Sequence, residues 1–408
     1  MEEEIIAETT HAVTTKQTGS SSFNPWKVIS LASAHSVHDV YSSFLAPLLP
    51  VLIERLSLLK VEAGLFMVFQ QWPSALQPVI GHYADRVNFK RLVLLAPAVT
   101  AVMMSLFAVV RTYWMATILL MVSGLASACL HSVAPAIISR FSGRQIGRGM
   151  SFWVISGELG FMLGPLFITT VITGFSIQAA PWLMVGGIAA SIALAFILKD
   201  VEFVTPDTNA RPLRDSRKRI IRVFLPLAGI LVMRALLRSA VETYMPVYLT
   251  ERGASLWLAG ASLTILEGAG ILGILLAGYF NDRIGPRWIF LTSLLGSPLL
   301  LYLFLTSSGS GQVILLILLG MASLCVVPVG MAVMQENFPE NRSFANGLYL
   351  AVLFLANAAA GLIMGGMADS MGTPQAFLWS VLICLMGIPF VFLLPEPKKI
   401  PDRENSRS

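Results

Sequence analysis

The chain has 408 residues, of which 55% are hydrophobic and 12% are charged, and its mean hydropathy is +0.73. Soluble globular chains carry about 25% charged residues, so this composition excludes an ordinary soluble protein and places most of the chain in lipid. The formal net charge of +5 does not indicate a nucleic-acid partner, because Lys and Arg gather in the cytoplasmic loops of membrane proteins. A polar, acidic opening precedes the first apolar stretch near Trp26, which is unlike a cleavable signal peptide.

Twelve apolar stretches reach the length of about 20 residues that a membrane-spanning helix needs. They predict an all-α membrane protein with spans near 27–53, 63–84, 92–110, 113–139, 149–173, 179–198, 223–249, 256–280, 288–306, 311–335, 344–368 and 375–394. Pro47 and Pro50 interrupt the first span. A membrane helix tolerates such a break where neighbouring helices satisfy the freed backbone groups.

Lys and Arg are distributed unevenly among the segments between these spans. With the N-terminus placed in the cytoplasm, 22 of them fall in cytoplasmic segments, 4 in outside loops and 2 within a span. Because positive charge is retained inside, we expect a multi-pass protein of the bacterial inner membrane with both termini cytoplasmic. The predicted parts are a tail (1–26), a six-helix bundle (27–198), a basic linker (199–222), a second six-helix bundle (223–394) and a tail (395–408).

The two halves of the chain repeat each other. Segment 81–91 (GHYADRVNFKR) follows the second predicted span, and segment 278–287 (GYFNDRIGPR) follows the eighth. Asp85 and Asp282 are 197 positions apart, and the same offset relates Glu54 to Glu251, Phe141 to Phe338 and Gly164 to Gly361. Parallel repeats of this kind place a substrate site at their interface near the midplane of the membrane.

Both loop segments resemble the major facilitator superfamily signature G-x-x-x-D-[RK]-x-G-x-[RK]-[RK], from which Asn88 and Trp288 depart. The resemblance implies the major facilitator fold, with twelve transmembrane helices in two pseudo-symmetric six-helix bundles. It also implies a cytoplasmic gate at the two loops, for which the candidate residues are Asp85, Arg86, Asp282, Arg283 and Arg140. These arginines are equally well explained as ordinary inside-loop charges.

Gly160-Phe-Met-Leu-Gly164-Pro165 in the fifth span resembles the G-x-x-x-G-P antiporter motif of the same superfamily. Small residues four positions apart let membrane helices approach closely, and a proline removes a backbone donor and bends its helix. We therefore expect Gly160, Gly164 and Pro165 to act in helix packing.

Three first-half segments resemble the fosmidomycin-resistance branch of drug efflux carriers. They are His35-Ser-Val-His38-Asp39, Leu76-Gln-Pro-Val-Ile-Gly81 and His131-Ser-Val-Ala-Pro135. His38 stands where that branch usually has Asn, and Ser132 stands where it usually has Pro. The branch implies export of a drug, and the second half offers no branch-specific match.

Ionisable residues inside the membrane are costly and are functional candidates by default. His35 and Asp39 are four apart and share one helix face, and a carboxylate beside an imidazole exchanges protons readily. We therefore predict Asp39 as the proton-coupling site, assisted by His35. Glu267 and Glu158, in the eighth and fifth spans, are the alternative proton sites.

Arg234, Arg238 and Glu242 form a stripe along the seventh span. A stripe of charge within lipid is expected to face a cavity, where arginine either holds an anionic substrate or pairs with a carboxylate. The predicted substrate-binding residues are Arg238, Arg234, Glu242, His131 and His38. A fixed structural ion pair, or histidines that only hydrogen-bond neighbouring helices, is the competing interpretation.

These features together predict a proton-coupled secondary transporter that works by alternating access and exports a small organic or toxic compound. The alternative is a proton symporter that imports a small organic or inorganic anion. We expect a monomer in the lipid bilayer whose partners are a small-molecule substrate and protons. No nucleotide-binding loop occurs in the sequence, and no cofactor or enzyme activity is expected. No metal site is expected either, because His35, His38 and Asp39 lack further ligands at matching spacing.

Overall fold

The computed structural model describes residues 23–84, 89–143, 145–200, 220–338 and 342–395, and this part of the chain is helical throughout with no strand. The first half contains α2 (Pro25–Ser42), α3 (Leu45–Leu56), α4 (Lys60–Gln71), η1 (Trp72–Leu76), α5 (Gln77–Ala84), α6 (Lys90–Phe107), α7 (Tyr113–Phe141), α8 (Ile146–Gly174), η2 (Ile177–Leu183) and α9 (Met184–Ile197). The second half contains η4 (Ile220–Phe224), α11 (Leu225–Glu242), α12 (Met245–Glu251), α13 (Leu256–Ile284), α14 (Pro286–Thr306), α15 (Ser310–Leu324), α16 (Val326–Asn337), α17 (Arg342–Met371), α18 (Thr373–Leu385) and α19 (Ile388–Leu393).

Eleven helical segments of the described chain are long and apolar enough to cross a membrane. The second predicted span is not among them, because its helix is interrupted where the 3₁₀ turn η1 separates α4 from α5. Pro73 lies in that turn, and its missing N–H together with its bulky ring prevents a regular α-helix from continuing. α4, η1 and α5 together cover the residues predicted for that span, and the count of twelve stays a prediction.

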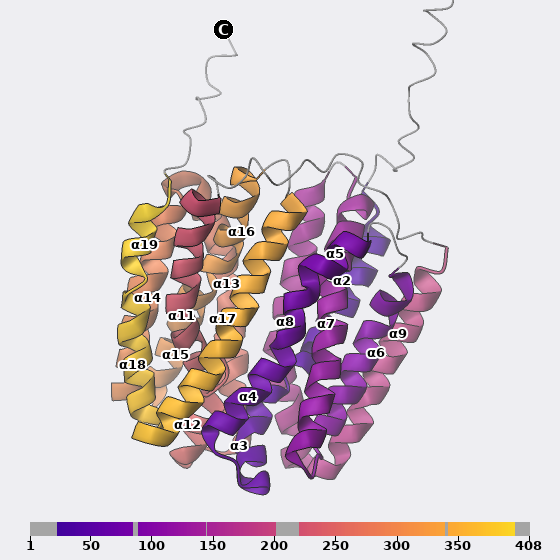
Figure 1. Ribbon diagram of the computed structural model, residues 1–408. Helices are drawn as coiled ribbons and strands as arrows, with labels where there is room; N and C mark the ends of the chain where they lie inside the picture. The colour runs from indigo at the N-terminus through magenta and orange to yellow at the C-terminus, as the bar shows by residue number, and fades with distance from the viewer. Residues whose placement is uncertain (1–22, 85–88, 144, 201–219, 339–341, 396–408) are drawn as a thin grey trace, which may run out of the picture.

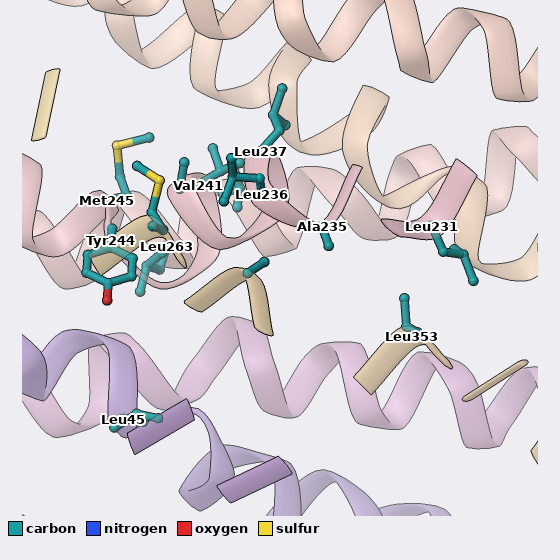
Figure 2. Packing of buried hydrophobic residues seen from close by; sticks show 14 of the residues in the cluster. Leu45, Leu231, Ala235, Leu236, Leu237, Val241, Tyr244, Met245, Leu263 and Leu353 are labelled. Atoms are coloured by element: carbon teal, nitrogen blue, oxygen red, sulfur yellow. The ribbon is translucent and has the colours of Figure 1, made fainter. Parts of the chain in front are cut away.

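The helices of the two halves form two groups that lie side by side (Figure 1). The groups meet where α8 packs against α13, where α4 packs against α17, and where α3 packs against α12. Buried hydrophobic side chains of both halves belong to one cluster: Figure 2 shows Leu231 of α11 facing Leu353 of α17, and Leu45 of α3, from the first half, further along. Apolar side chains gain little from leaving lipid, so close packing is what holds such helices together.

Glycines bring α8 close to α2 inside the first half. A Cβ at Gly160 would lie 2.5 Å from the Ser36 carbonyl oxygen, and a Cβ at Gly164 would overlap Ser43 and the Val40 carbonyl. Pro165 does not end the helix, since α8 runs unbroken from Ile146 to Gly174. The glycines therefore fix α2 and α8 as one tightly packed unit.

Segments that were predicted to be cytoplasmic lie together at one end of the bundle. The backbone N–H of Asn24 donates to the Phe141 carbonyl at 2.8 Å. The Lys90 ammonium likewise donates to the Lys199 carbonyl at 2.6 Å. Each bond joins two segments of the predicted inner side, so the two predicted faces are separated in the fold.

The opposite end carries polar bonds between the two halves. Lys60, at the start of α4, pairs through Nζ with Glu251 of α12 at 2.6 Å. The Asp369 carboxylate of α17 accepts hydrogen bonds from the backbone N–H groups of Lys60 and Val61 at 2.9 and 2.8 Å. A carboxylate at a helix N-terminus satisfies unpaired N–H groups and complements the helix dipole. The two halves are thus fastened together at this end.

Candidate functional site

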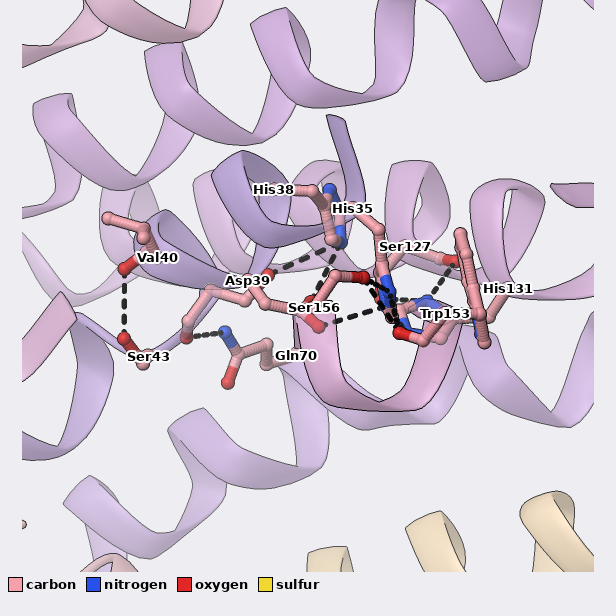
Figure 3. Close-up of polar contacts among 11 residues, drawn as sticks. His35, His38, Asp39, Val40, Ser43, Gln70, Ser127, His131, Trp153 and Ser156 are labelled. Atoms are coloured by element: carbon pink, nitrogen blue, oxygen red, sulfur yellow. Dashed lines mark hydrogen bonds and ion pairs between the residues drawn. The ribbon is translucent and has the colours of Figure 1, made fainter. Parts of the chain in front are cut away.

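Two histidines and an aspartate meet in the interior of the first half (Figure 3). His35 and Asp39 lie on consecutive turns of α2, and His35 Nε2 is 3.0 Å from Asp39 Oδ2. His131 comes from α7, and its Nε2 is 3.1 Å from the same His35 nitrogen. We call these three residues the histidine cluster. His35 and Asp39 are only 4% and 2% exposed and His131 is partly exposed, so two of the three residues are held away from solvent.

The other nitrogen of each imidazole is bonded to the backbone. His35 Nδ1 contacts the Trp153 carbonyl at 3.0 Å, and His131 Nδ1 contacts the Ser127 carbonyl at 3.0 Å. A carbonyl can only accept, so both Nδ1 atoms carry the hydrogen and donate. In the neutral imidazoles both Nε2 atoms are therefore acceptors, and they face each other and the Asp39 carboxylate.

α8 closes the histidine cluster from one side. The Trp153 ring stacks on the His35 ring with 3.5 Å between centroids and an angle of 3°. A Cβ at Gly157 would lie 2.7 Å from His35 Cε1 and 2.9 Å from Asp39 Oδ2, so only glycine leaves room for both side chains. The Phe354 ring of α17 approaches His131 with centroids 6.3 Å apart, which is a contact from the second half.

His38 lies beside the cluster without joining it. Its Nε2 is 3.3 Å from Ser42 Oγ and 3.8 Å from Asp39 Oδ1, and the residue is fully buried. The sequence treated His38 and His131 alike as candidate substrate contacts. The structure separates them, because only His131 bonds to His35.

A second group of charges lies where the halves meet, and we call it the charged group. Arg238 and Glu242 of α11 form an ion pair at 2.6 Å. Glu158 of α8 and Glu267 of α13 interact electrostatically with each other and with this pair, and Glu158 also interacts with Asp39. Three carboxyl groups therefore share one guanidinium. Two of the predicted proton sites and two of the predicted substrate residues lie in this group.

Arg234 lies apart from the charged group. It is 5% exposed and donates from Nη2 to the carbonyl of Ser323 in α15 at 2.5 Å. Arg234 and Arg238 are on one helix and were predicted as one stripe. The structure gives them different surroundings, since the Arg234 guanidinium bonds to a neighbouring helix of its own half.

The predicted gate lies largely outside the described residues. Asp85 and Arg86, and the side chain of Asp282, fall there. Arg283 is exposed with its guanidinium 4.1 Å from the Tyr279 ring centroid, and Arg140 is exposed at the end of α7. The roles predicted for these five residues stay predictions.

Sequence reasoning missed the residues that hold these sites in place. Ser156 and Gly157 lie beside His35, yet each type is common in membrane helices as packing, and their spacing carries no motif. Lys60 and Asp369, which join the two halves at the end opposite the predicted cytoplasmic side, are far apart in the chain. Gly157 offered the one available signal, because it precedes Gly160 and Gly164 at the spacing of one helix face.

Comparison with known proteins agrees with this architecture. The sequence profile of the Major Facilitator Superfamily matches residues 31–274 and 227–408. The fosmidomycin resistance protein of Escherichia coli (strain K12) is 21% identical over 380 residues, which cover 91% of this chain and 93% of the relative.

Solved structures share the fold at low sequence identity. A bacterial homolog of the human lysosomal transporter Spinster, in an inward-facing conformation, has a TM-score of 0.76 at 13% identity and covers 90% of this chain and 96% of its own. A D-xylose–proton symporter has a TM-score of 0.72 at 16% identity and covers 91% and 98%. With the family profile spanning both halves, the chain belongs to the major facilitator superfamily and is a multi-pass membrane transporter.

Proposed function

We propose that this transporter is a proton-coupled exporter of a small organic or toxic compound and that it works by alternating access. Protons enter from outside as the substrate leaves. The carrier lies in the bacterial inner membrane with its Lys- and Arg-rich end and both termini in the cytoplasm. It acts as a monomer.

The charged group carries this proposal. Three carboxyl groups and one guanidinium, if all were ionised, would leave an excess of negative charge inside the membrane. Such an excess is costly, so it is relieved by binding protons or a cationic part of a substrate. Protons and the cationic substrate group would neutralise the same negative charge, so they compete for the site. Such competition is the basis of antiport.

The roles within the group follow from position. Glu158 comes from the first half, while Glu267 comes from the second. We place proton coupling on these two carboxyls rather than on Asp39, because they come from both halves, whereas Asp39 and the histidines nearest to it all belong to the first half. An outside proton binds one of them and weakens the hold on the substrate, which leaves. Reorientation and proton loss to the cytoplasm then reset the carrier.

The direction of transport is supported by the relatives. A transporter that resembles a fosmidomycin resistance protein over 91% of this chain is explained most simply if it removes a harmful compound from the cell. The G-x-x-x-G-P pattern at Gly160, Gly164 and Pro165 is typical of antiporters in this superfamily.

Arg238 is the observation that favours a second candidate, a proton symporter importing an anion. It is the cation of the charged group, and the D-xylose–proton symporter shares the fold. Two facts weigh against this candidate. Arg238 is already neutralised by Glu242 at 2.6 Å, and the other candidate anion ligand, Arg234, is bonded to the Ser323 carbonyl.

Inside-out vesicles with an acidic interior distinguish the two functions. Cells lacking their own efflux carriers are first screened for resistance conferred by this protein, with fosmidomycin among the compounds tested. A substrate found in this way should raise the pH inside the vesicles as it enters, because protons leave in exchange. Substrate movement accompanied by protons in the same direction would establish symport, and movement without any proton flux would overturn proton coupling.

A further inference from the structure

Three electron-pair acceptors meet in the histidine cluster. They are Nε2 of His35, Nε2 of His131 and Oδ2 of Asp39, with 3.0 and 3.1 Å between neighbours. Because both Nδ1 atoms donate to carbonyls, no hydrogen remains on either Nε2 of a neutral ring. One added proton bridges two of the three acceptors, whereas a cation at their centre is bonded by all three. We propose that His35, Asp39 and His131 bind a divalent transition-metal ion.

The spacing of the three atoms suits such an ion. The candidate ligand atoms lie within 4.8 Å of one another. Imidazole and carboxylate ligands surround a tetrahedral Zn²⁺ at about 2.0–2.2 Å, which places neighbouring ligand atoms about 3.3–3.6 Å apart. The separations from His35 Nε2 are slightly short of this value at 3.0 and 3.1 Å, and the pair His131 and Asp39 lies within 4.8 Å, so binding an ion requires the side chains to adjust around it. Two histidines and one carboxylate leave a fourth position for water or another ligand.

The surroundings of the histidines are those of metal ligands. A metal-bound imidazole nearly always donates its other N–H to a carbonyl or carboxylate, which fixes its tautomer and orientation. His35 does so to Trp153 and His131 does so to Ser127. Ser156 Oγ, whose own hydrogen is donated to the Trp153 carbonyl at 2.7 Å, also accepts from His35 Nδ1 at 3.2 Å. Both Nε2 atoms are thus held ready as ligands before any ion arrives.

The charge and chemistry of the cluster select the class of ion. Two neutral imidazoles and one carboxylate carry a single negative charge, which a divalent cation more than compensates in this buried place. Imidazole favours Zn²⁺, Cu²⁺ and Ni²⁺ over Ca²⁺ and Mg²⁺, which prefer sites made of oxygen ligands. The third ligand belongs to α7, so no spacing within α2 alone reveals the site.

A Zn²⁺ titration of the purified full-length carrier tests the site. The affinity tag must contain no histidine, and binding is followed by calorimetry in detergent. We expect one strong site in the wild type. Loss of an outer partner of a metal ligand typically costs about 10–100-fold in affinity, so His131→Ser, which removes a ligand itself, should weaken binding at least as much.

A matched substitution separates a ligand from a structural histidine. Cys and Ser have nearly the same shape, but a cysteine thiolate binds Zn²⁺ well. We expect His131→Cys to recover most of the affinity that His131→Ser loses, while His38→Asn, which changes the histidine outside the cluster, binds as the wild type does. Equal affinities for His131→Ser and the wild type would overturn the proposal, as would equal weakening by Cys and Ser.

An experiment on the wild type alone covers the case in which the variants fail to fold. X-ray absorption of the Zn²⁺-loaded carrier should show scattering from two imidazole rings together with oxygen ligands. Absence of imidazole scattering, or absence of Zn²⁺ binding altogether, would mean that the cluster holds only a proton and would refute the metal site. None of these readouts depends on transport, so failure of the proposed function leaves the test unaffected.

Discussion

The two polar groups inside the bundle differ in how they are divided between the halves. All three residues of the histidine cluster, and the α8 residues that support it, come from the first half. The charged group takes Glu158 from the first half and its other three members from the second. In alternating access the halves rock as nearly rigid bodies about the central site. Distances within the histidine cluster should then persist through the cycle, whereas distances within the charged group should change.

This difference assigns different work to the two groups. A cluster with constant geometry is suited to hold one ligand in every state. A group divided between the halves changes its electrostatics with conformation, so the proton binding that we propose for it and reorientation would affect each other, as linkage requires. Glu158 also interacts with Asp39, which makes it the point where the two groups meet.

Glu267→Gln should give the largest effect, because it removes a carboxyl of the charged group that we propose to bind protons, while keeping the size of the side chain. We expect substrate exchange to persist and proton-driven accumulation to fall to a ratio of about 1, since an uncoupled carrier only equilibrates its substrate. The measurement is uptake into inside-out vesicles with and without a pH gradient. Glu158→Gln is the matched change in the other half. If both variants accumulate substrate as the wild type does, the proton is bound elsewhere.

Gly164→Ala should damage the rigid unit formed by α2 and α8. Its Cβ would overlap Ser43 and the Val40 carbonyl, and backbone cannot move aside without separating the helices. Inserting a methyl group into a well-packed interface costs about 1–3 kcal/mol, so thermal unfolding in detergent should occur at a lower temperature. Gly174→Ala is the control on the same helix, because nothing lies within 4 Å of its Cβ. Equal unfolding temperatures for both variants would show that α8 is not fixed in this way.

Particular residues show how far the sequence could lead. The repeat at an offset of 197 positions and the two loop segments predicted the fold class correctly. The length of the apolar stretches predicted eleven of the spans. Hydropathy predicts one helix for the second span, but the structure has three pieces there, because Pro73 and Pro78 interrupt the backbone hydrogen bonds. A hydropathy average over about 20 residues does not detect such a local break in the helix.

The sites were less accessible to sequence reasoning. His35 and Asp39 were paired correctly because a spacing of four is visible in the chain, and the 3.0 Å contact follows from it. His131 could not be assigned to them, since 96 positions separate it from His35 and only tertiary packing of α7 on α2 joins them. The same spacing rule grouped Arg234 with Arg238, although α15 gives Arg234 a separate partner.

Removing Arg238 from the charged group should lower the stability of the carrier by an intermediate amount. Breaking a fully buried ion pair costs about 3–5 kcal/mol, and exposed pairs contribute little. Since the side chains of Arg238 and Glu242 are 21% and 20% exposed, we expect Arg238→Gln to destabilise the carrier by about 2 kcal/mol, a reduced value between these limits. The double variant Arg238→Gln/Glu242→Gln should recover part of this loss, because Glu242 no longer adds an unpaired negative charge beside Glu158 and Glu267. Thermal unfolding of the two single variants and the double variant measures the coupling, and additive losses would contradict an ion pair.

His38→Asn should have the smallest effect and so marks the boundary of the histidine cluster. The imidazole is buried, and besides an edge contact with the His131 ring it makes one side-chain hydrogen bond, to Ser42 Oγ at 3.3 Å; such a bond adds about 0.5–1.5 kcal/mol to stability. Unfolding should therefore shift only slightly, and transport should keep both its rate and its dependence on pH. Transport rates measured across a range of pH values check this. A shifted pH profile would place His38 among the groups that exchange protons with Asp39, 3.8 Å away, and the cluster would then have four members.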